Sequence, residues 1–390
     1  MIYLDNAATT KTAPEAVEAM LPYLTEMYGN PSALYSMGSA AKKAVNEARR
    51  TIADMIGARQ EEIYFTAGGT ESDNWALKAA AESSGKGRHI ITTKIEHHAV
   101  LHTCRYLEKR GYEITYLDVD GDGLVDPEEL RKAIRPDTIL ISIMFANNEI
   151  GTIEPIKEIG AIARERGVLF HTDAVQAFGQ VPIDVDELHI DMLSASAHKL
   201  NGPKGTGMLY IRTGLDLCPF VHGGAQERNR RAGTENVPGI IGFAAAAKRA
   251  HGRMEEKAAK EAALRDYLIG RIEAEIPYCR LNGHRTRRLP GNVNFSFDLI
   301  QGESLVIMLD MKGVCASSGS ACTSGALDPS HVLLAIGLTH EEAQGSLRMT
   351  LSEENTEEEM DTVAEYLKEI VARLREMSPL YEDFMKARRD

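Results

Sequence analysis

The stretch SASAHKLNGPKG, residues 194–205, decides how this sequence is interpreted. Small residues lead to one lysine, Lys199, and a turn rich in glycine and proline follows it directly. A lysine held among small residues at the end of a strand loses part of its hydration. That loss lowers the pKa of its amine and makes the amine a better nucleophile towards a carbonyl carbon. The same pattern also describes an ordinary solvated lysine beside a turn, so the role of Lys199 has to be inferred from other segments of the chain.

Length, composition and charge limit the class of protein. The 390 residues suffice for a large domain and a smaller one. A hydrophobic content of 43% and a charged content of 26% are ordinary for a soluble globular protein. The net charge of -13 disfavours direct binding to nucleic acids or to anionic membranes. No apolar run has membrane length and the first residues do not resemble a signal peptide, so we expect neither feature.

The cysteines indicate a reducing compartment. They number five and contain no CxxC pair: Cys104, Cys218, Cys279, Cys315 and Cys322. An odd number without paired spacing favours reduced thiols in an intracellular, cytoplasmic protein, in which a single cysteine can have a chemical role. We expect Cys315 to be buried in a strand.

Strands and helices alternate through the first two thirds of the chain. The predicted strands are 62–66, 89–93, 112–117, 139–145, 168–171, 192–194 and 207–211. Helical patterns lie between most of them, which is typical of an α/β fold with a mostly parallel, seven-stranded sheet flanked by helices. This large domain is expected to span residues 14–255.

The remaining sequence predicts a smaller α+β domain. Short strands are expected at 292–297, near 314 and at 345–351, with helices after 302, from 329 and over 356–376. Because their order is mixed, we expect an antiparallel-compatible sheet. This domain is expected to combine residues 1–13 with residues 256–390.

Two segments that follow predicted strands resemble ligand-binding loops. The segment AGGTESDN, residues 67–74, brings glycines and hydroxyls to the start of a helix, where backbone N–H groups can surround an anion; a simple helix cap is the alternative. The segment DVDGDGLVDPEE, residues 118–129, fits the spacing of an EF-hand calcium loop. A strand-like stretch precedes it, however, and Asp126 followed by Pro127 is typical of a helix start, so we favour a turn.

The polar residues at the strand ends match the requirements of pyridoxal phosphate. Lys199 can form a Schiff base with its aldehyde, and Asp173 can keep its pyridine nitrogen protonated. Asn148 and Gln176 can donate hydrogen bonds to the phenolate oxygen of the ring. His97 can stack on the ring and move protons.

With these residues in view, the sequence resembles the NifS/IscS-type cysteine desulfurases of the class V aminotransferase group. The segments concerned are ESDN (71–74), EHHAV (96–100), NNEIG (147–151), HK (198–199), GPKG (202–205), RAGT (231–234) and SSGSAC (317–322). The match extends from residues 3–8 to residues 378–381.

The resemblance implies a pyridoxal phosphate homodimer that takes sulfur from L-cysteine and releases L-alanine. It implies that Lys199 and His97 are catalytic and that Arg348 holds the substrate carboxylate together with Asn148. The cofactor-binding residues that it implies are Gly69, Thr70, Asn148, Asp173, Gln176, Ser196, His198 and, from the partner subunit, Thr234. No metal is expected.

The resemblance assigns the nucleophile to Cys322, which would carry the sulfur as a persulfide. The cysteine lies in a run of small polar residues that we expect to form a mobile loop. A protein acceptor, such as an iron–sulfur scaffold, is expected to take the sulfur. Two departures leave the acceptor open: residues 349–355 are more acidic than is usual in the family, and the tail after residue 381 is short.

Other functions remain open at this point. A selenocysteine lyase or an aminotransferase would use the same cofactor, and an aminotransferase would not need Cys322. A non-catalytic sulfur carrier or a calcium-regulated binding protein would bind no such cofactor.

Overall fold

The computed structural model describes residues 1–318 and 329–379, together with positions 381, 384 and 386. Its central feature is a seven-stranded sheet with the strand order β2-β8-β7-β6-β5-β3-β4. The strands are β2 (Ile63–Thr66), β3 (His89–Thr93), β4 (Glu113–Leu117), β5 (Thr138–Ser142), β6 (Leu169–Asp173), β7 (Met192–Ser196) and β8 (Gly207–Ile211). Strand β8 runs antiparallel to β2 and β7, whereas the other pairs of this sheet are parallel. The predicted α/β fold with a mostly parallel sheet is therefore confirmed.

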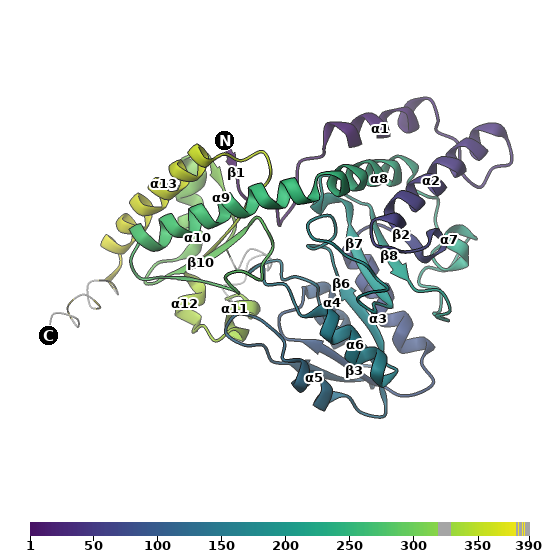
Figure 1. Ribbon diagram of the computed structural model, residues 1–390, viewed down its shortest axis with the longest axis horizontal. Coiled ribbons are helices and arrows are strands. Elements are labelled where there is room, and N and C mark those ends of the chain that lie inside the picture. The colour runs from purple at the N-terminus through teal and green to yellow at the C-terminus, as the bar shows by residue number, and fades with distance from the viewer. Residues whose placement is uncertain (319–328, 380, 382–383, 385, 387–390) are drawn as a thin grey trace.

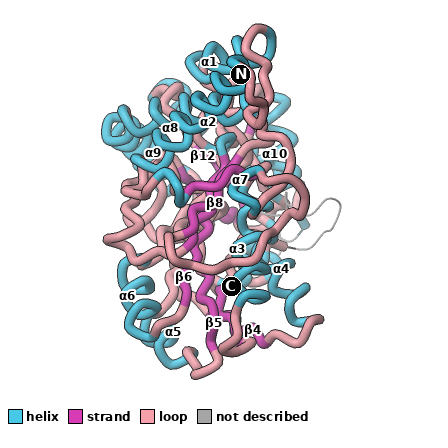
Figure 2. The backbone as a smooth tube through the Cα atoms, turned by 90° about the vertical axis from the view of Figure 1, so that its right-hand side faces the viewer, coloured by secondary structure: helices cyan, strands magenta, loops and turns pink. Residues whose placement is uncertain are grey.

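Helices cover both faces of this sheet (Figure 2). One face packs against α2 (Ser36–Asp54), α5 (Pro127–Ala133), α6 (Ile156–Arg166) and α8 (Val237–Gly252), and the other against α3 (Gly69–Ser83) and α4 (His98–Glu108). Successive strand residues alternate between the two layers, as the pleat requires: Ile91 faces the first and Ile90 the second. Helix α1 (Pro14–Thr25) lies along α8, and α7 (Gln226–Asn229) is a short turn.

A second, smaller sheet has its own hydrophobic core (Figure 1). Its antiparallel strands are β9 (Cys279–Leu281), β10 (Asn292–Phe297) and β12 (Ser346–Thr350), and β9 was not predicted. The helices that line this core are α9 (Met254–Glu275), α10 (Gly302–Met311) and α13 (Glu357–Glu376). The short helices α11 (His331–Ala335) and α12 (His340–Gln344) lie nearby.

The N-terminal arm joins the smaller sheet. Strand β1 (Ile2–Tyr3) pairs in parallel with β11 (Val314–Cys315), and Leu4 lies in the smaller core. Cys315 is in a strand as expected, but it is half-buried because it belongs to a two-stranded ribbon. The domain boundaries at residues 13 and 255 stay a prediction that the separate cores support. Within the described part of the chain, no helix is both long and apolar enough to cross a bilayer.

Candidate active site

A cleft of about 1130 Å³ opens at the edge of the large sheet where the parallel strands end. Strands β2, β7, β6, β5 and β3 point the same way, so the residues that follow them meet at this edge. The predicted residues that line the cleft are Gly69, Thr70, His97, Asn148, Asp173, Gln176, Ser196, His198, Lys199 and Arg348. Thr234 is exposed and is not among the lining residues of this chain, and Cys322 lies outside the described residues.

Lys199 reaches the cleft from a short 3-10 turn directly after β7. Its side chain is half-buried, and its Nζ donates to the carbonyl oxygens of Ala7 and, at 2.8 Å, of Ala8. The amide nitrogen of Gln176 also donates to the Ala7 oxygen, at 3.0 Å. The N-terminal arm therefore crosses the site and holds the two side chains next to each other.

The polar end of β6 brings a buried carboxylate to the cleft. Asp173 is 5% exposed, and its Oδ1 accepts a hydrogen bond from the backbone N–H of Val175 at 2.9 Å. Burial raises the pKa of Asp173 to about 6, although the Val175 N–H and the charge of Lys199 act in the opposite direction. Such a carboxylate is positioned to pair with a cationic ring nitrogen.

His97 is the N-cap residue of α4 and stays uncharged. Its Nδ1 accepts from the backbone N–H of Ala99 at 3.1 Å, so its other ring nitrogen, Nε2, carries the proton. Burial, reinforced by the charge of Lys199, lowers the pKa of His97 to about 4. A neutral imidazole in this position can stack on an aromatic ring and exchange a proton at Nε2.

The first turn of α3 offers an open helix N-terminus to the cleft. No side chain caps this end of the helix, so its backbone N–H groups are available to an anion. A Cβ atom on Gly69 would lie 2.5 Å from Cγ2 of Val175, which follows β6. Glycine therefore allows the helix start to lie directly against the end of β6.

Ser196 and His198 face the same end of the cleft as the α3 N-terminus. His198 Nδ1 lies 3.1 Å from the hydroxyl oxygen of Thr9, and burial together with the charge of Lys199 lowers the pKa of His198 to about 4. The neutral imidazole of His198, the hydroxyls of Ser196 and Thr70 and the backbone N–H groups at the start of α3 are hydrogen-bond donors that suit a phosphate.

Arg348 enters the cleft from β12 of the smaller sheet. Its guanidinium donates to the backbone oxygen of Asn148 at 3.0 Å and pairs with Asp5 at 2.9 Å. It is 6% exposed, and its Nε has no hydrogen-bond partner among the described residues. A buried guanidinium with an unused donor is suited to a small carboxylate.

The residues on either side of the segment that contains Cys322 are anchored in or near the cleft. Ser317 forms backbone hydrogen bonds with Arg348 in both directions, at 2.7 and 3.1 Å, and lines the cleft. On the other side, the Ser330 hydroxyl donates to the buried carboxylate of Glu149, which is next to Asn148 in the chain. These anchors lie at positions 317 and 330, outside the undescribed residues 319–328.

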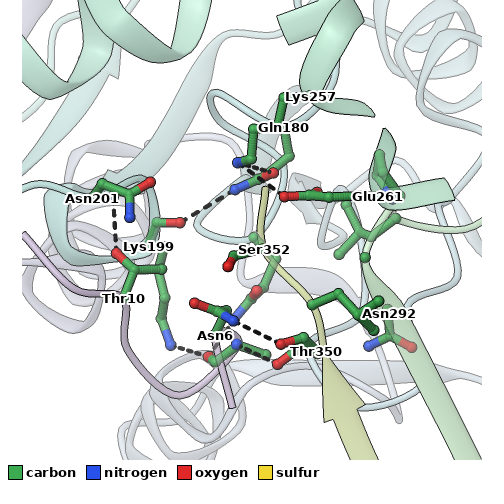
Figure 3. Close-up of a pocket in the computed structure, with 16 residues that line it drawn as sticks. Asn6, Thr10, Gln180, Lys199, Asn201, Lys257, Glu261, Asn292, Thr350 and Ser352 are labelled. Atoms are coloured by element: carbon green, nitrogen blue, oxygen red, sulfur yellow. Dashed lines mark hydrogen bonds and ion pairs between the residues drawn. The ribbon is translucent and has the colours of Figure 1, made fainter. Parts of the chain in front are cut away.

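A smaller pocket of about 500 Å³ shares Ala7, Gln176 and Lys199 with the cleft (Figure 3). In it, Gln180 donates to the backbone oxygen of Lys199 at 3.3 Å and accepts from Lys257 at 2.8 Å. Lys257 pairs in turn with Glu261 at 3.7 Å. This buried chain of contacts connects the backbone of Lys199 to α9.

Glu353, one of the acidic residues after β12 that are unusual for the family, is neutralised by nearby arginines. The carboxylate of Glu353 forms ion pairs with Arg249 and, at 2.9 Å, with Arg253 at the junction of α8 and α9. The negative charge at this position therefore links the smaller sheet to the helices of the larger one.

Sequence reasoning missed two acidic residues of the cleft, Asp5 and Asp73. Asp73 could have been found, because it shares the buried helical spacing of Ala76, Leu77 and Ala80 and is the charged residue on that apolar face. No comparable signal marks Asp5, whose position depends on the N-terminal arm.

Comparisons with known proteins identify the family of this chain. The family model described as aminotransferase class-V matches residues 2–363. Among curated proteins, a cysteine desulfurase IscS of Methanosarcina thermophila is 59% identical over 97% of this chain and 94% of its own length. One of Clostridium botulinum is 56% identical over 99% of this chain and 98% of its own length.

Solved structures give the same result. A NifS-like protein superimposes with a TM-score of 0.90 at 40% identity, covering 96% of this chain and all of its own. A structure described as SspA in complex with cysteine has a TM-score of 0.81 at 38% identity, covering 90% of this chain and 99% of its own. The family represented by these relatives depends on pyridoxal phosphate. The chain therefore belongs to the class-V aminotransferase family and, within it, to the cysteine desulfurases.

Proposed function

We propose that this protein binds pyridoxal phosphate and transfers sulfur from L-cysteine to Cys322, releasing L-alanine. The observation that carries the proposal is that Lys199, Asp173 and the open N-terminus of α3 line one cleft. An amine for the aldehyde, a carboxylate for the pyridine nitrogen and donors for the phosphate are thus available together. The names of the relatives support the same activity and the same substrate.

The geometry of the cleft fits this cofactor in two respects. Gly69 permits a close approach of the α3 N-terminus to the β6 end, which a side chain at that position would block. Asp173 is a buried acid that accepts only a backbone hydrogen bond in the described structure, so a cationic ring nitrogen would offset its burial. We infer that Gly69, Thr70, Ser196 and His198 hold the phosphate group.

The other predicted site residues of the cleft each receive a task in this proposal. Pyridoxal phosphate, when bound, supplies a ring that accepts electrons from the substrate. The Lys199 amine would hold the cofactor, and Asn148 and Gln176 would orient the ring. Arg348 would bind the substrate carboxylate through its unused Nε donor, and His97 would exchange a proton through Nε2.

Cys322 is proposed to accept the sulfur. In the overall reaction its thiol and L-cysteine yield a persulfide on Cys322 and L-alanine, so that the C–S bond of the substrate breaks as an S–S bond forms. Ser317, five positions earlier, lies in the cleft wall. Five residues of extended chain span at most about 17 Å, so a reach of the Cys322 thiol into this cleft is compatible with covalent geometry.

The proposal includes a homodimer and a protein sulfur acceptor in the cytoplasm. Thr234 is exposed in this chain, which agrees with a role in the site of a partner subunit. An iron–sulfur scaffold is the acceptor suggested by the resemblance, and trapping proteins through a disulfide to Cys322 would identify it.

The direct test measures L-alanine and persulfide formation from L-cysteine. The wild-type protein should form both, and Cys322→Ala should retain the visible absorbance of the bound cofactor but form no persulfide. Cys315→Ala, in the preceding strand β11, is the matched control and should keep both activities. Transamination of L-cysteine that is independent of Cys322 would contradict the proposal.

A further inference from the structure

Asp73 is a buried acid in the cleft that the chemistry above does not use. It lies near the start of α3, is 1% exposed and lines the cleft. Its Oδ1 has no hydrogen-bond partner among the described residues. A buried carboxylate with an unpartnered oxygen is costly, so its presence at this position requires an explanation.

Among the described residues, no positively charged group is a direct neighbour of Asp73. Oxygen atoms of Asp73 and Asp173 and a ring nitrogen of His97 lie within 4.8 Å of one another. His171 on β6 is a potential cation at this position, and its Nε2 is 3.7 Å from Asp73 Oδ1. Burial lowers the pKa of His171 to about 3, so both histidines are uncharged near neutral pH.

The acids around Asp73 cannot all be ionised. Asp73, Glu96 and Asp173 are each at least nine-tenths buried. Burial, and next the nearby Asp173, raise the pKa of Asp73 well above its ordinary range, while Ser194 on β7 opposes this. Burial likewise raises the pKa of Glu96. Among these three acids, Asp173 is the one whose ionised form is favoured by the positive charge of Lys199.

We propose that Asp73 is a positioning residue that stays an uncharged carboxylic acid and leaves the negative charge of this acid cluster on Asp173. This inference rests on the proposed function and deepens it. An uncharged Asp73 adds no like charge beside Asp173 and can offer its proton as a hydrogen-bond donor to it. The single negative charge then lies where the ring nitrogen of the cofactor would need it.

The protonation state is tested on the cofactor-free protein. An acid that is protonated in the fold makes the folded state bind more protons than the unfolded chain, in which the pKa of aspartate is about 3.9. Asp73 should therefore contribute a fall in melting temperature as the pH rises above about 4. In Asp73→Asn this fall should be smaller. An unchanged fall would show that Asp73 is already ionised in the fold and would overturn the proposal.

A matched control distinguishes the effect of an acid in the cleft from the general effect of burying an acid. Glu154 is a second buried acid, 3% exposed, and burial raises its pKa to about 8, but it does not line the cleft. Glu154→Gln should reduce the fall in melting temperature in the same way as Asp73→Asn. It should leave the cofactor affinity unchanged.

The positioning role is tested by titrating cofactor-free protein with pyridoxal phosphate and following its visible absorbance and the pH midpoint of that band. Asp73→Asn keeps an uncharged donor and should bind within about threefold of the wild type with the same midpoint. Asp73→Ala removes the donor and should bind about tenfold more weakly with a shifted midpoint.

Two results of this titration would overturn the proposal. Equal losses in Asp73→Asn and Asp73→Ala would mean that a negative charge is required at this position. Unchanged binding in Asp73→Ala would mean that the acid positions nothing. If the wild type bound no pyridoxal phosphate, the proposed function would fail, whereas the melting series would still decide the protonation of Asp73.

Discussion

Two loops that follow strands of the same sheet show why one motif forms a site and the other forms a turn. Both begin after a strand and both resemble a ligand-binding pattern: residues 67–74 after β2 and residues 118–129 after β4. In the second loop, Asp120 accepts hydrogen bonds from the backbone N–H groups of Asp122 and Leu124, both at 2.9 Å. Asp126 accepts from the N–H of Glu128 at 2.8 Å and caps α5. The predicted turn and helix start are confirmed.

The first loop satisfies only some of its donors. The N–H groups of Ala67 and Gly68 donate to side chains nearby in the chain, but no side chain among the described residues caps the N-terminus of α3. The loop opens into a cleft in which Asp73 Oδ1 and Arg348 Nε have no hydrogen-bond partner among the described residues. Spacing alone did not distinguish the two loops. The difference is whether the backbone and side chains of a loop already satisfy one another, because a loop that does so has little left to offer a ligand.

The largest expected contrast is between a carboxylate at the cleft and one in the turn. Asp173→Asn should lower turnover of L-cysteine by about 100- to 1000-fold, because the charge facing the cofactor nitrogen is lost. Asp120→Asn keeps the oxygen that accepts both N–H groups and should stay within about twofold of the wild type. Equal effects of the two substitutions on steady-state alanine formation would break the comparison.

The same buried carboxylate predicts a pH dependence of stability without cofactor. Burial raises the pKa of Asp173 to about 6, above the value of about 3.9 in an unfolded chain. The folded protein therefore binds more protons between these values, and its stability should fall as the pH rises from about 4 to about 6. Thermal melts of Asp173→Asn should show a smaller fall over this range, and a steeper one would contradict the assigned environment.

Glycines offer a second, smaller contrast. Gly69→Ala would place a Cβ atom 2.5 Å from Val175 and force α3 away from β6, so affinity for pyridoxal phosphate should fall about tenfold. Gly121→Ala, in the turn, has its nearest contact at 3.9 Å and should change neither affinity nor stability. Fluorescence or absorbance titration of the two variants measures the difference. Normal affinity in Gly69→Ala would show that the close approach is not needed.

The smallest effect is expected in the turn itself. Asp120→Ala removes an acceptor of two hydrogen bonds and should cost about 1 kcal/mol of unfolding free energy. Calcium should not change the melting temperature of the wild type. Micromolar calcium binding in calorimetry that disappears in Asp120→Ala would restore the EF-hand interpretation.

Local patterns predicted the large sheet and several of the candidate site residues. Most strands were recognisable because their residues are buried on both faces. Lys199, Asp173 and His97 were recognisable because they lie at the end of a strand or at the start of a helix. Other candidates, such as Arg348 and Thr234, were predicted from the family resemblance. The end of the predicted strand 139–145 was placed too late, since β5 stops at Ser142 and the following apolar residues are buried outside the sheet.

What the sequence did not predict depends on contacts between distant segments. The pairing of Arg348 with Asp5 joins residues 343 positions apart, and the contact of Gln180 with Lys257 joins residues 77 positions apart. The three-residue strand β9 is too short to show a period. The helical spacing of Asp73 indicates that it is buried, but the missing hydrogen-bond partner of its Oδ1 among the described residues is known only from the structure.

The most direct test of the account is to fix the cofactor in place and identify its attachment point. Pyridoxal phosphate is added to the purified protein, borohydride reduces any Schiff base, and the digested chain is analysed by mass spectrometry. We predict a stable adduct on the peptide that contains Lys199, and none in Lys199→Ala. An adduct on another lysine, or no adduct in the wild type, would contradict the central claim that the amine after β7 holds the cofactor in this cleft.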